Sequence, residues 1–250
     1  MRPALRHGTG PRKAIVMGGW MGCAAHWQEF LGAIDAQAFE VAVFDYRGYG
    51  TRRGLAGAWT FHEAAGDVLQ LADALGWSRF SLIGHSMGGM AMQRVALAAP
   101  ARVERLLGIA AVSAAGSGMD ASRVALFEQA VADAAIRSRI VDFSTGQRLS
   151  KAWCDRIAAD SWQSHRPEAV AAYLREWAFD GFADEAGTLR LPVKLLLGEH
   201  DPSITTALAE RSWRLHHPQV EIETIGNAGH YPMQEAPIAV ASSVQRWLAT

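Results

Sequence analysis

The sequence contains very little cysteine. Its two cysteines, Cys23 and Cys154, lie far apart and form none of the close pairs that bind zinc or carry out redox chemistry. We therefore expect two buried free thiols rather than a disulfide framework, and a cytoplasmic protein. The histidines show no metal-ligand spacing either, so no metal site is expected.

Excess charge and long apolar runs are also missing. The formal net charge is −1, which does not favour nucleic acid or an anionic membrane surface as a partner. No apolar run reaches the roughly 18 residues of a membrane-spanning helix, and the basic segment Met1–Lys13 lacks the apolar core of a signal peptide. We therefore expect no nucleic-acid and no membrane partner, and the oligomeric state stays open.

Short apolar runs alternate with helix-like segments along most of the chain. One helix opens with the capping-box pattern Thr60-Phe-His-Glu63 and keeps helical apolar spacing as far as Leu75. This alternation predicts one α/β domain with a doubly wound, mostly parallel sheet. The runs expected to form its strands are Ala14–Met17, Val41–Phe44, Phe80–Ile83, Leu106–Val112, Val193–Leu197 and Val220–Ile225.

The alternation is interrupted between residues 114 and 188. Gly116-Ser-Gly118 is typical of a hinge, and the segment after it carries several helix-like stretches with aromatic side chains. We therefore predict a helical cap at 114–188, inserted into an α/β core formed by residues 1–113 and 189–250.

The most informative stretch is Gly84-His-Ser-Met-Gly88, which has the pattern G-x-S-x-G. It follows a predicted strand and precedes a predicted helix, the context in which this pattern forms a nucleophile elbow. Such a turn is sharp and strained, so bulky residues at the flanking positions would clash with the backbone. Ser86 is therefore the candidate nucleophile.

A serine hydroxyl is a poor nucleophile near neutral pH and needs a base that a carboxylate orients. His230 lies in a loop after the last predicted strand, and Asp201 follows the run Val193–Leu197. Because the carboxyl ends of parallel strands share one edge of a sheet, we expect both side chains to meet Ser86 there. Glu199 is a rival to Asp201 as the orienting acid.

The remaining requirement is a pair of N–H donors for the oxyanion. The amide of Met87, directly after the nucleophile, is one candidate. The other is the amide of Trp20, because Gly18-Gly19-Trp20 forms the loop after the first predicted strand.

Taken together, these motifs resemble the α/β-hydrolase superfamily, in its helical-capped esterase, lactonase and carbon–carbon hydrolase branch. The resemblance implies a nucleophile at Ser86, an acid at Asp201, a base at His230, and an oxyanion hole from the Trp20 and Met87 amides. The matching stretches are Gly18–Trp20, Phe44–Gly50, Gly84–Gly89, Gly198–Asp201 and Asn227–Tyr231.

Two features depart from the pattern of that superfamily. Many members carry His-Gly where this chain has Gly18-Gly19. The segment before Ala14 is also short for the antiparallel hairpin that begins many relatives, so one or both of those strands are expected to be missing.

The favoured function is a serine hydrolase that cleaves a small, largely apolar carboxylic ester or lactone through an acyl-enzyme, with no cofactor and no metal. Carbon–carbon cleavage of a β-diketone on the same triad is an alternative, as are a thioesterase, a proline-type aminopeptidase and a non-catalytic ligand receptor. The residues that we expect in the substrate pocket are His26, Trp153, Trp162 and Trp177.

Overall fold

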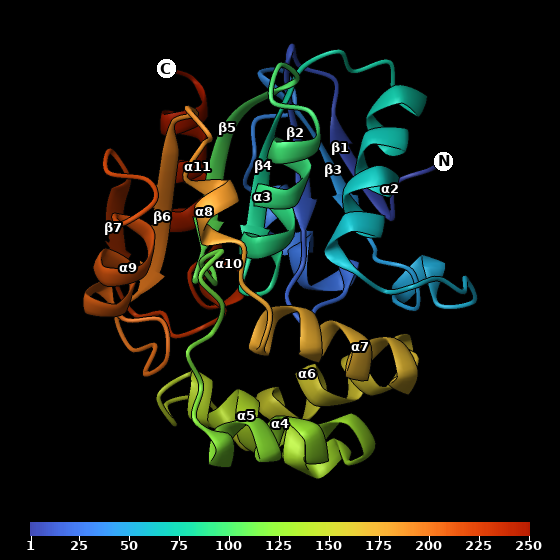
Figure 1. The fold of residues 1–250 in the computed structure, drawn as a ribbon, viewed down its shortest axis with the longest axis vertical. Helices are drawn as coiled ribbons and strands as arrows, with labels where there is room; N and C mark the ends of the chain where they lie inside the picture. The colour runs from blue at the N-terminus through green and yellow to red at the C-terminus, as the bar shows by residue number, and fades with distance from the viewer.

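The computed structural model describes residues 1–250 and is built around one seven-stranded sheet (Figure 1). The strand order is β1-β3-β2-β4-β5-β6-β7, and every pairing except that of β1 with β3 is parallel. All six residues of the central strand β4 are buried, as both faces of a parallel sheet require. The strands are β1 (Leu5–Gly8), β2 (Arg12–Met17), β3 (Phe39–Phe44), β4 (Phe80–His85), β5 (Val103–Ile109), β6 (Val193–Gly198) and β7 (Glu221–Ile225).

The strand β1 decides between the alternatives left by the short N-terminal segment, that one or both antiparallel strands are missing. It pairs antiparallel with β3, with Leu5 opposite Val43, so one antiparallel strand is present at this edge. Leu5 is its only large apolar residue, and Arg6 forms an ion pair with the buried Glu40 of β3. The strand therefore carries no apolar run that could be recognised in the sequence.

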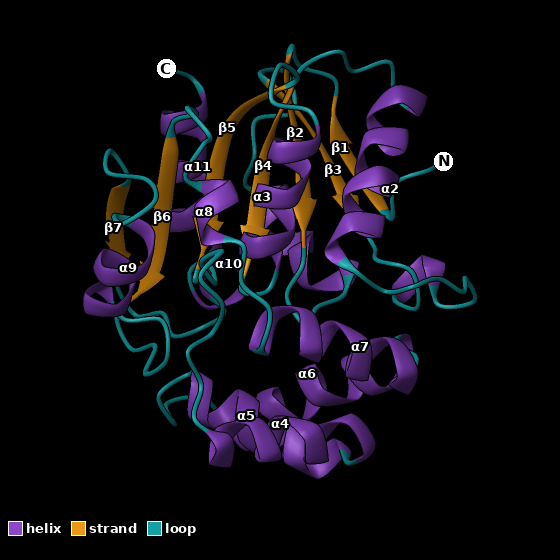
Figure 2. Ribbon diagram, in the orientation of Figure 1, coloured by secondary structure: helices purple, strands orange, loops and turns teal.

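Helices cover both faces of the sheet (Figure 2). On one face α2 and α3 pack against each other, and α1 packs against α11 on the other. None of the helices combines the length and apolarity needed to cross a membrane. The helices of the α/β core are η1 (Ala24–Trp27), α1 (Gln28–Gly32), η2 (Gly50–Arg52), α2 (Phe61–Ala74), α3 (Gly88–Ala98), α8 (Ala183–Ala186), α9 (Thr206–Trp213), α10 (Pro232–Glu235) and α11 (Pro237–Leu248).

A separate layer of four helices lies beyond the carboxyl ends of the strands (Figure 1). It consists of α4 (Ala121–Ala132), α5 (Ala134–Ser144), α6 (Lys151–Ser164) and α7 (Pro167–Ala178), all between β5 and β6. We call these four helices the insert. The short helix α8 packs against α3 of the core instead. The cap boundaries at 114 and 188 stay a prediction.

Hydrogen bonds tie one side of the insert to the core. The Trp20 indole donates to the carbonyl of Val170 in α7 at 2.7 Å. The amide of Phe61, at the start of α2, donates to the carboxylate of Glu176 at 2.6 Å. A buried indole N–H would be costly without such a partner, so these bonds fix α7 over the sheet edge.

Candidate active site

Ser86 occupies the sharp turn between β4 and α3, with a φ of 51°. This left-handed conformation is uncommon for a residue with a side chain. A Cβ added to Gly84 would lie 2.3 Å from the carbonyl oxygen of Gly88, and one added to Gly88 would lie 2.3 Å from that of Met17. Only glycine fits at both flanking positions, so the turn can present the serine hydroxyl at the sheet edge.

The structure brings Ser86, His230 and Asp201 into one hydrogen-bonded row. With its proton on Nδ1, His230 donates to Oδ2 of Asp201 at 2.6 Å. Its Nε2 then accepts from the Ser86 hydroxyl at 3.0 Å. The three residues come from segments that follow β4, β6 and β7, at the same edge of the sheet.

Asp201 is held as an anion. Burial acts to raise its pKa, but His230 and the amides of Ser203 and Ile204 outweigh burial, and the pKa lies below its usual value. These amides donate to Oδ1 at 2.8 and 3.0 Å. The rival Glu199 instead accepts from the amide of Asn227 at 3.1 Å and has no contact with the imidazole.

His85 contacts the main chain of the base, a role that the sequence did not predict. Its Nε2 donates to the carbonyl of His230 at 2.8 Å. Burial, together with the charge of His230, lowers the pKa of His85 to about 3, so it stays neutral. His85 is the first x of the G-x-S-x-G pattern, where any residue type is allowed, so the pattern does not indicate this role.

The insert also contacts the backbone of the base. The amide of His230 donates to the carbonyl of Ser144, the last residue of α5, at 3.0 Å. A Cβ on Gly229 would lie 2.6 Å from the Cα of Thr145. Glycine at 229 is therefore what allows the loop of the base to pass so close to the insert.

The two amides expected to bind an oxyanion have no hydrogen-bond partner within the chain. Neither the Trp20 nor the Met87 N–H donates to a main-chain or side-chain acceptor. A Cβ added to Gly19, the residue before Trp20, would be 2.8 Å from Nδ1 of His85 and 3.1 Å from the Cβ of Ser86. Glycine at 19 lets this loop approach the nucleophile.

A cavity of about 300 Å³ lies between Ser86, His230 and the insert. Three aromatic rings form one wall, with centroid distances of 5.3 Å for Trp20–Phe127, 6.1 Å for Trp20–Trp177 and 5.2 Å for Phe127–Trp177. Trp177 is the only one of the four expected pocket residues that lines this cavity. The wall is apolar, as suits an acyl or alkyl group.

The other three expected pocket residues lie elsewhere. His26 is buried, with Nε2 3.4 Å from the Asp160 carboxylate. Trp153 packs edge-on against Tyr231, and Trp162 is 41% exposed on the outer surface of the insert. Aromatic residues on helices do not reveal which face meets a cavity, so the sequence could not separate these three from Trp177.

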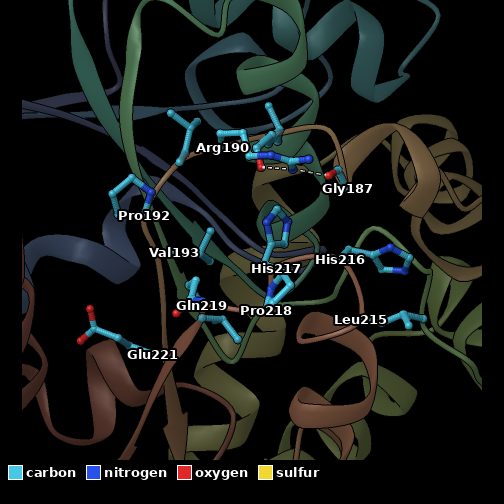
Figure 3. Close-up of a pocket in the computed structure, with 13 residues that line it drawn as sticks. Gly187, Arg190, Pro192, Val193, Leu215, His216, His217, Pro218, Gln219 and Glu221 are labelled. Carbon is cyan, nitrogen blue, oxygen red and sulfur yellow. Dashed lines mark hydrogen bonds between the residues drawn. The ribbon is translucent and has the colours of Figure 1, made fainter.

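A larger cavity, of about 730 Å³, lies at the opposite, amino ends of β6 and β7 (Figure 3). Arg190 donates there to the carbonyl of Gly187 at 2.7 Å, and His217 is within hydrogen-bond distance of Gln93, at 3.1 Å. No serine, threonine or cysteine lines this cavity. Nowhere in the chain do three or more His, Cys, Asp or Glu side chains gather closely enough to hold a metal ion.

Known proteins resemble this chain in sequence and in fold. A family model described as "Alpha/beta hydrolase family" matches residues 7–243. A candidate carbamate hydrolase, RutD, of Variovorax paradoxus (strain S110) is 36% identical over 103 residues, which are 40% of this chain and 39% of that protein. A pimeloyl-[acyl-carrier protein] methyl ester esterase of Pectobacterium carotovorum subsp. carotovorum is 33% identical over 41% of this chain and 38% of that protein. The matches thus span about two fifths of each relative's length.

Solved structures share the fold over nearly the whole chain. A bromoperoxidase from Bacillus anthracis has a TM-score of 0.86 at 18% identity and covers 98% of this chain and 94% of its own. An enol-lactonase from Burkholderia xenovorans LB400 has a TM-score of 0.83 at 22% identity and covers 98% and 95%. At such identities the likeness establishes the fold.

Proposed function

Since the chain belongs to the α/β-hydrolase family, we propose that it is a serine hydrolase that cleaves a small, largely apolar carboxylic ester or lactone through an acyl-enzyme. The observation that carries the proposal is the row of hydrogen bonds from Asp201 through His230 to Ser86. That row supplies a nucleophile, a base in reach of its proton, and an anion that orients the base.

In this mechanism Ser86 attacks the substrate carbonyl while Nε2 of His230 takes the hydroxyl proton. The imidazolium is stabilised by Asp201 and then gives its proton to the leaving alcohol. Water enters, loses a proton to His230 and cleaves the acyl-enzyme, which restores Ser86 and releases the acid. His85 takes no part in proton transfer and acts as a positioning residue, because it stays neutral and holds the carbonyl of His230.

The free amides of Trp20 and Met87 support an oxyanion hole. Buried N–H groups without partners are rare, and these two belong to the residue after the nucleophile and to the residue after Gly19, which approaches Ser86 closely. Donors aimed at the charge that develops in the transition state contribute about 10²–10³ in rate each. The amides therefore complete the set of groups that acyl transfer needs.

Cavity size and the comparisons support the substrate class. A volume of about 300 Å³ lies at the small end of ligand pockets and suits a short substrate. Among the proteins similar to this chain are a methyl ester esterase and an enol-lactonase, which are named for ester and lactone substrates.

The test is Ser86→Ala, assayed with a panel of short-chain esters, lactones and a β-diketone. We expect ester or lactone turnover to fall by about 10⁴-fold or more, since removing one member of a triad costs about that much. A fluorophosphonate should label the native protein and not the variant, while circular dichroism shows the fold unchanged. Unaltered turnover in Ser86→Ala contradicts the mechanism. Cleavage of the β-diketone alone would show that the triad catalyses carbon–carbon bond hydrolysis instead of ester hydrolysis.

A further inference from the structure

The charged side chains that line the small cavity are of one sign. Apart from its histidines and the neutral Tyr231, the ionisable residues that line the cavity are Arg123 and Arg211, and no aspartate or glutamate lines it. Asp201 lies behind the wall, fully engaged with His230 and two amides. A hollow lined by uncompensated cations attracts and orients anions.

Arg211 reaches the cavity from α9. Thr205, Leu208 and Arg211 all line the cavity, and their spacing of three places them on one face of this helix. The Arg211 guanidinium has no ion pair and no hydrogen bond with the rest of the chain. The next arginine of the same segment, Arg214, faces away from the cavity and contacts Glu210 at 3.8 Å.

Arg123 reaches the cavity from α4 of the insert. Nη2 donates to the hydroxyl of Ser203 at 2.7 Å, and the guanidinium has no carboxylate within ion-pair distance. The neighbouring carboxylate, Asp120, is instead occupied by the amide of Arg123 and the hydroxyl of Ser122. Most of the N–H groups of Arg123 are therefore free to bind a ligand.

Several half-buried arginines elsewhere in the chain have acidic partners, which the two cavity arginines lack. Buried and half-buried examples are Arg52 with Asp67, and Arg148 with Glu235. A guanidinium presents paired N–H groups whose geometry matches a carboxylate, and such charge-assisted bonds are about twice as strong as neutral ones. An unpaired guanidinium facing a substrate cavity is thus a ready site for that group.

We propose that the substrate carries a carboxylate, held by Arg211 and Arg123, in addition to the ester or lactone bond at Ser86. The proposal rests on the hydrolase function proposed above and narrows its substrate to half-esters of small dicarboxylic acids or to lactones with a carboxylate side chain. The aromatic wall of Trp20, Phe127 and Trp177 contacts the apolar part, and the arginines face the charged end.

The experiment compares charged and neutral esters of matched size. Monomethyl adipate is set against methyl heptanoate for charge on the acyl side, and 4-acetoxybenzoate against methyl 4-acetoxybenzoate for charge on the alcohol side. We expect native kcat/KM to favour the carboxylate in at least one pair by about tenfold, a typical value for one charge-assisted contact. In Arg211→Gln that preference should be lost through a higher KM, with the neutral ester unaffected.

Three further variants test whether the carboxylate preference depends on the two cavity arginines. Arg214→Gln removes the same charge from the same segment outside the cavity and should keep the preference, and Arg211→Lys should keep part of it. Arg123→Gln should lower the ratio of charged to neutral turnover, and any disturbance of the Ser203 loop cancels in that ratio.

The two proposals fail in different ways. Equal or better turnover of both neutral esters, with a ratio unchanged in Arg211→Gln and Arg123→Gln, overturns the carboxylate site and leaves the hydrolase standing. Absence of any ester or lactone turnover that depends on Ser86 overturns the hydrolase, and the carboxylate site falls with it.

Discussion

The cavity at Ser86 and the larger cavity at the amino ends of β6 and β7 differ in the chemistry of the residues that line them. The larger, at the amino ends of β6 and β7, has two histidines and an arginine, yet these groups are bonded to their neighbours or face solvent (Figure 3). Burial and the charge of His216 lower the pKa of His217 to about 4, so it is a neutral residue bonded to Gln93.

The smaller cavity, at the carboxyl ends, has less space and more directed chemistry. A hydroxyl, an imidazole and a carboxylate form one hydrogen-bonded row. The amides of Trp20 and Met87 have no hydrogen-bond partner within the chain, and the guanidinium groups of Arg123 and Arg211 have no acidic partner. Volume alone would have favoured the other end of the sheet. Unsatisfied donors aimed at one point are what distinguish a reaction site from a surface hollow.

The largest expected effect comes from removing one histidine at each end. His230→Gln should lower kcat by about 10⁴-fold or more, because it removes the base from the serine. His216→Gln, in the larger cavity, should leave kcat and KM unchanged. Steady-state kinetics on one ester measures both, and a comparable loss in the two variants would erase the distinction between the cavities.

A smaller effect is expected from adding a single methyl group beside the nucleophile. In Gly19→Ala the new Cβ would press on the buried His85 ring and on Ser86. Shifting the nucleophile or the Trp20 amide by a fraction of an ångström should lower kcat by about 10²-fold. Gly66→Ala is the control, because a Cβ at that exposed helix position meets nothing within 4 Å; equal activity of the two variants would show that the close approach at 19 has no catalytic value.

The smallest expected effect is on stability, and it comes from the contact between His26 of the core and Asp160 of the insert. Burial acts to lower the pKa of His26, but Asp160 and Cys23 raise it to about 9, from 6.5 in the unfolded chain. The charged form therefore contributes stability fully below about pH 6.5, and this contribution is lost as the pH rises through about 9. Because Asp160 is about one-third exposed and the 3.4 Å contact lacks hydrogen-bond geometry, we expect only about 1 kcal/mol.

Urea unfolding of the native protein and of His26→Gln, at intervals from about pH 6 to about pH 10, measures this contribution. The difference in unfolding free energy between the two proteins should shrink as the pH rises. Asp160→Asn should remove most of the same pH dependence. A difference that grows with pH would mean that His26 is neutral when folded.

Much of the fold and of the candidate site could be predicted because the informative residues stand at strand ends. Ser86, Asp201 and His230 each follow an apolar run, and parallel strands bring such positions to one edge. The need for glycine at positions 84 and 88 could also be predicted, and the structure shows that backbone contacts there leave no room for a Cβ. These signals are local in the sequence, even though the contacts they create are not.

What could not be predicted depends on which side of a helix faces inward. Arg123 and Arg211 lie on helices separated by most of the insert, and nothing local indicates that both face one cavity. The same limit explains why Trp177 lines the cavity and Trp162 does not. The edge strand β1 was missed for a different reason, because its pairing depends on backbone bonds and on Arg6 rather than on an apolar run.

The hydrogen bond from the His230 amide to Ser144 joins the loop of the base to the last residue of α5. A displacement of α5 would break this bond and remove one of the contacts that position the loop of the imidazole. The strength of the base therefore depends on residues of the insert as well as on residues of the core.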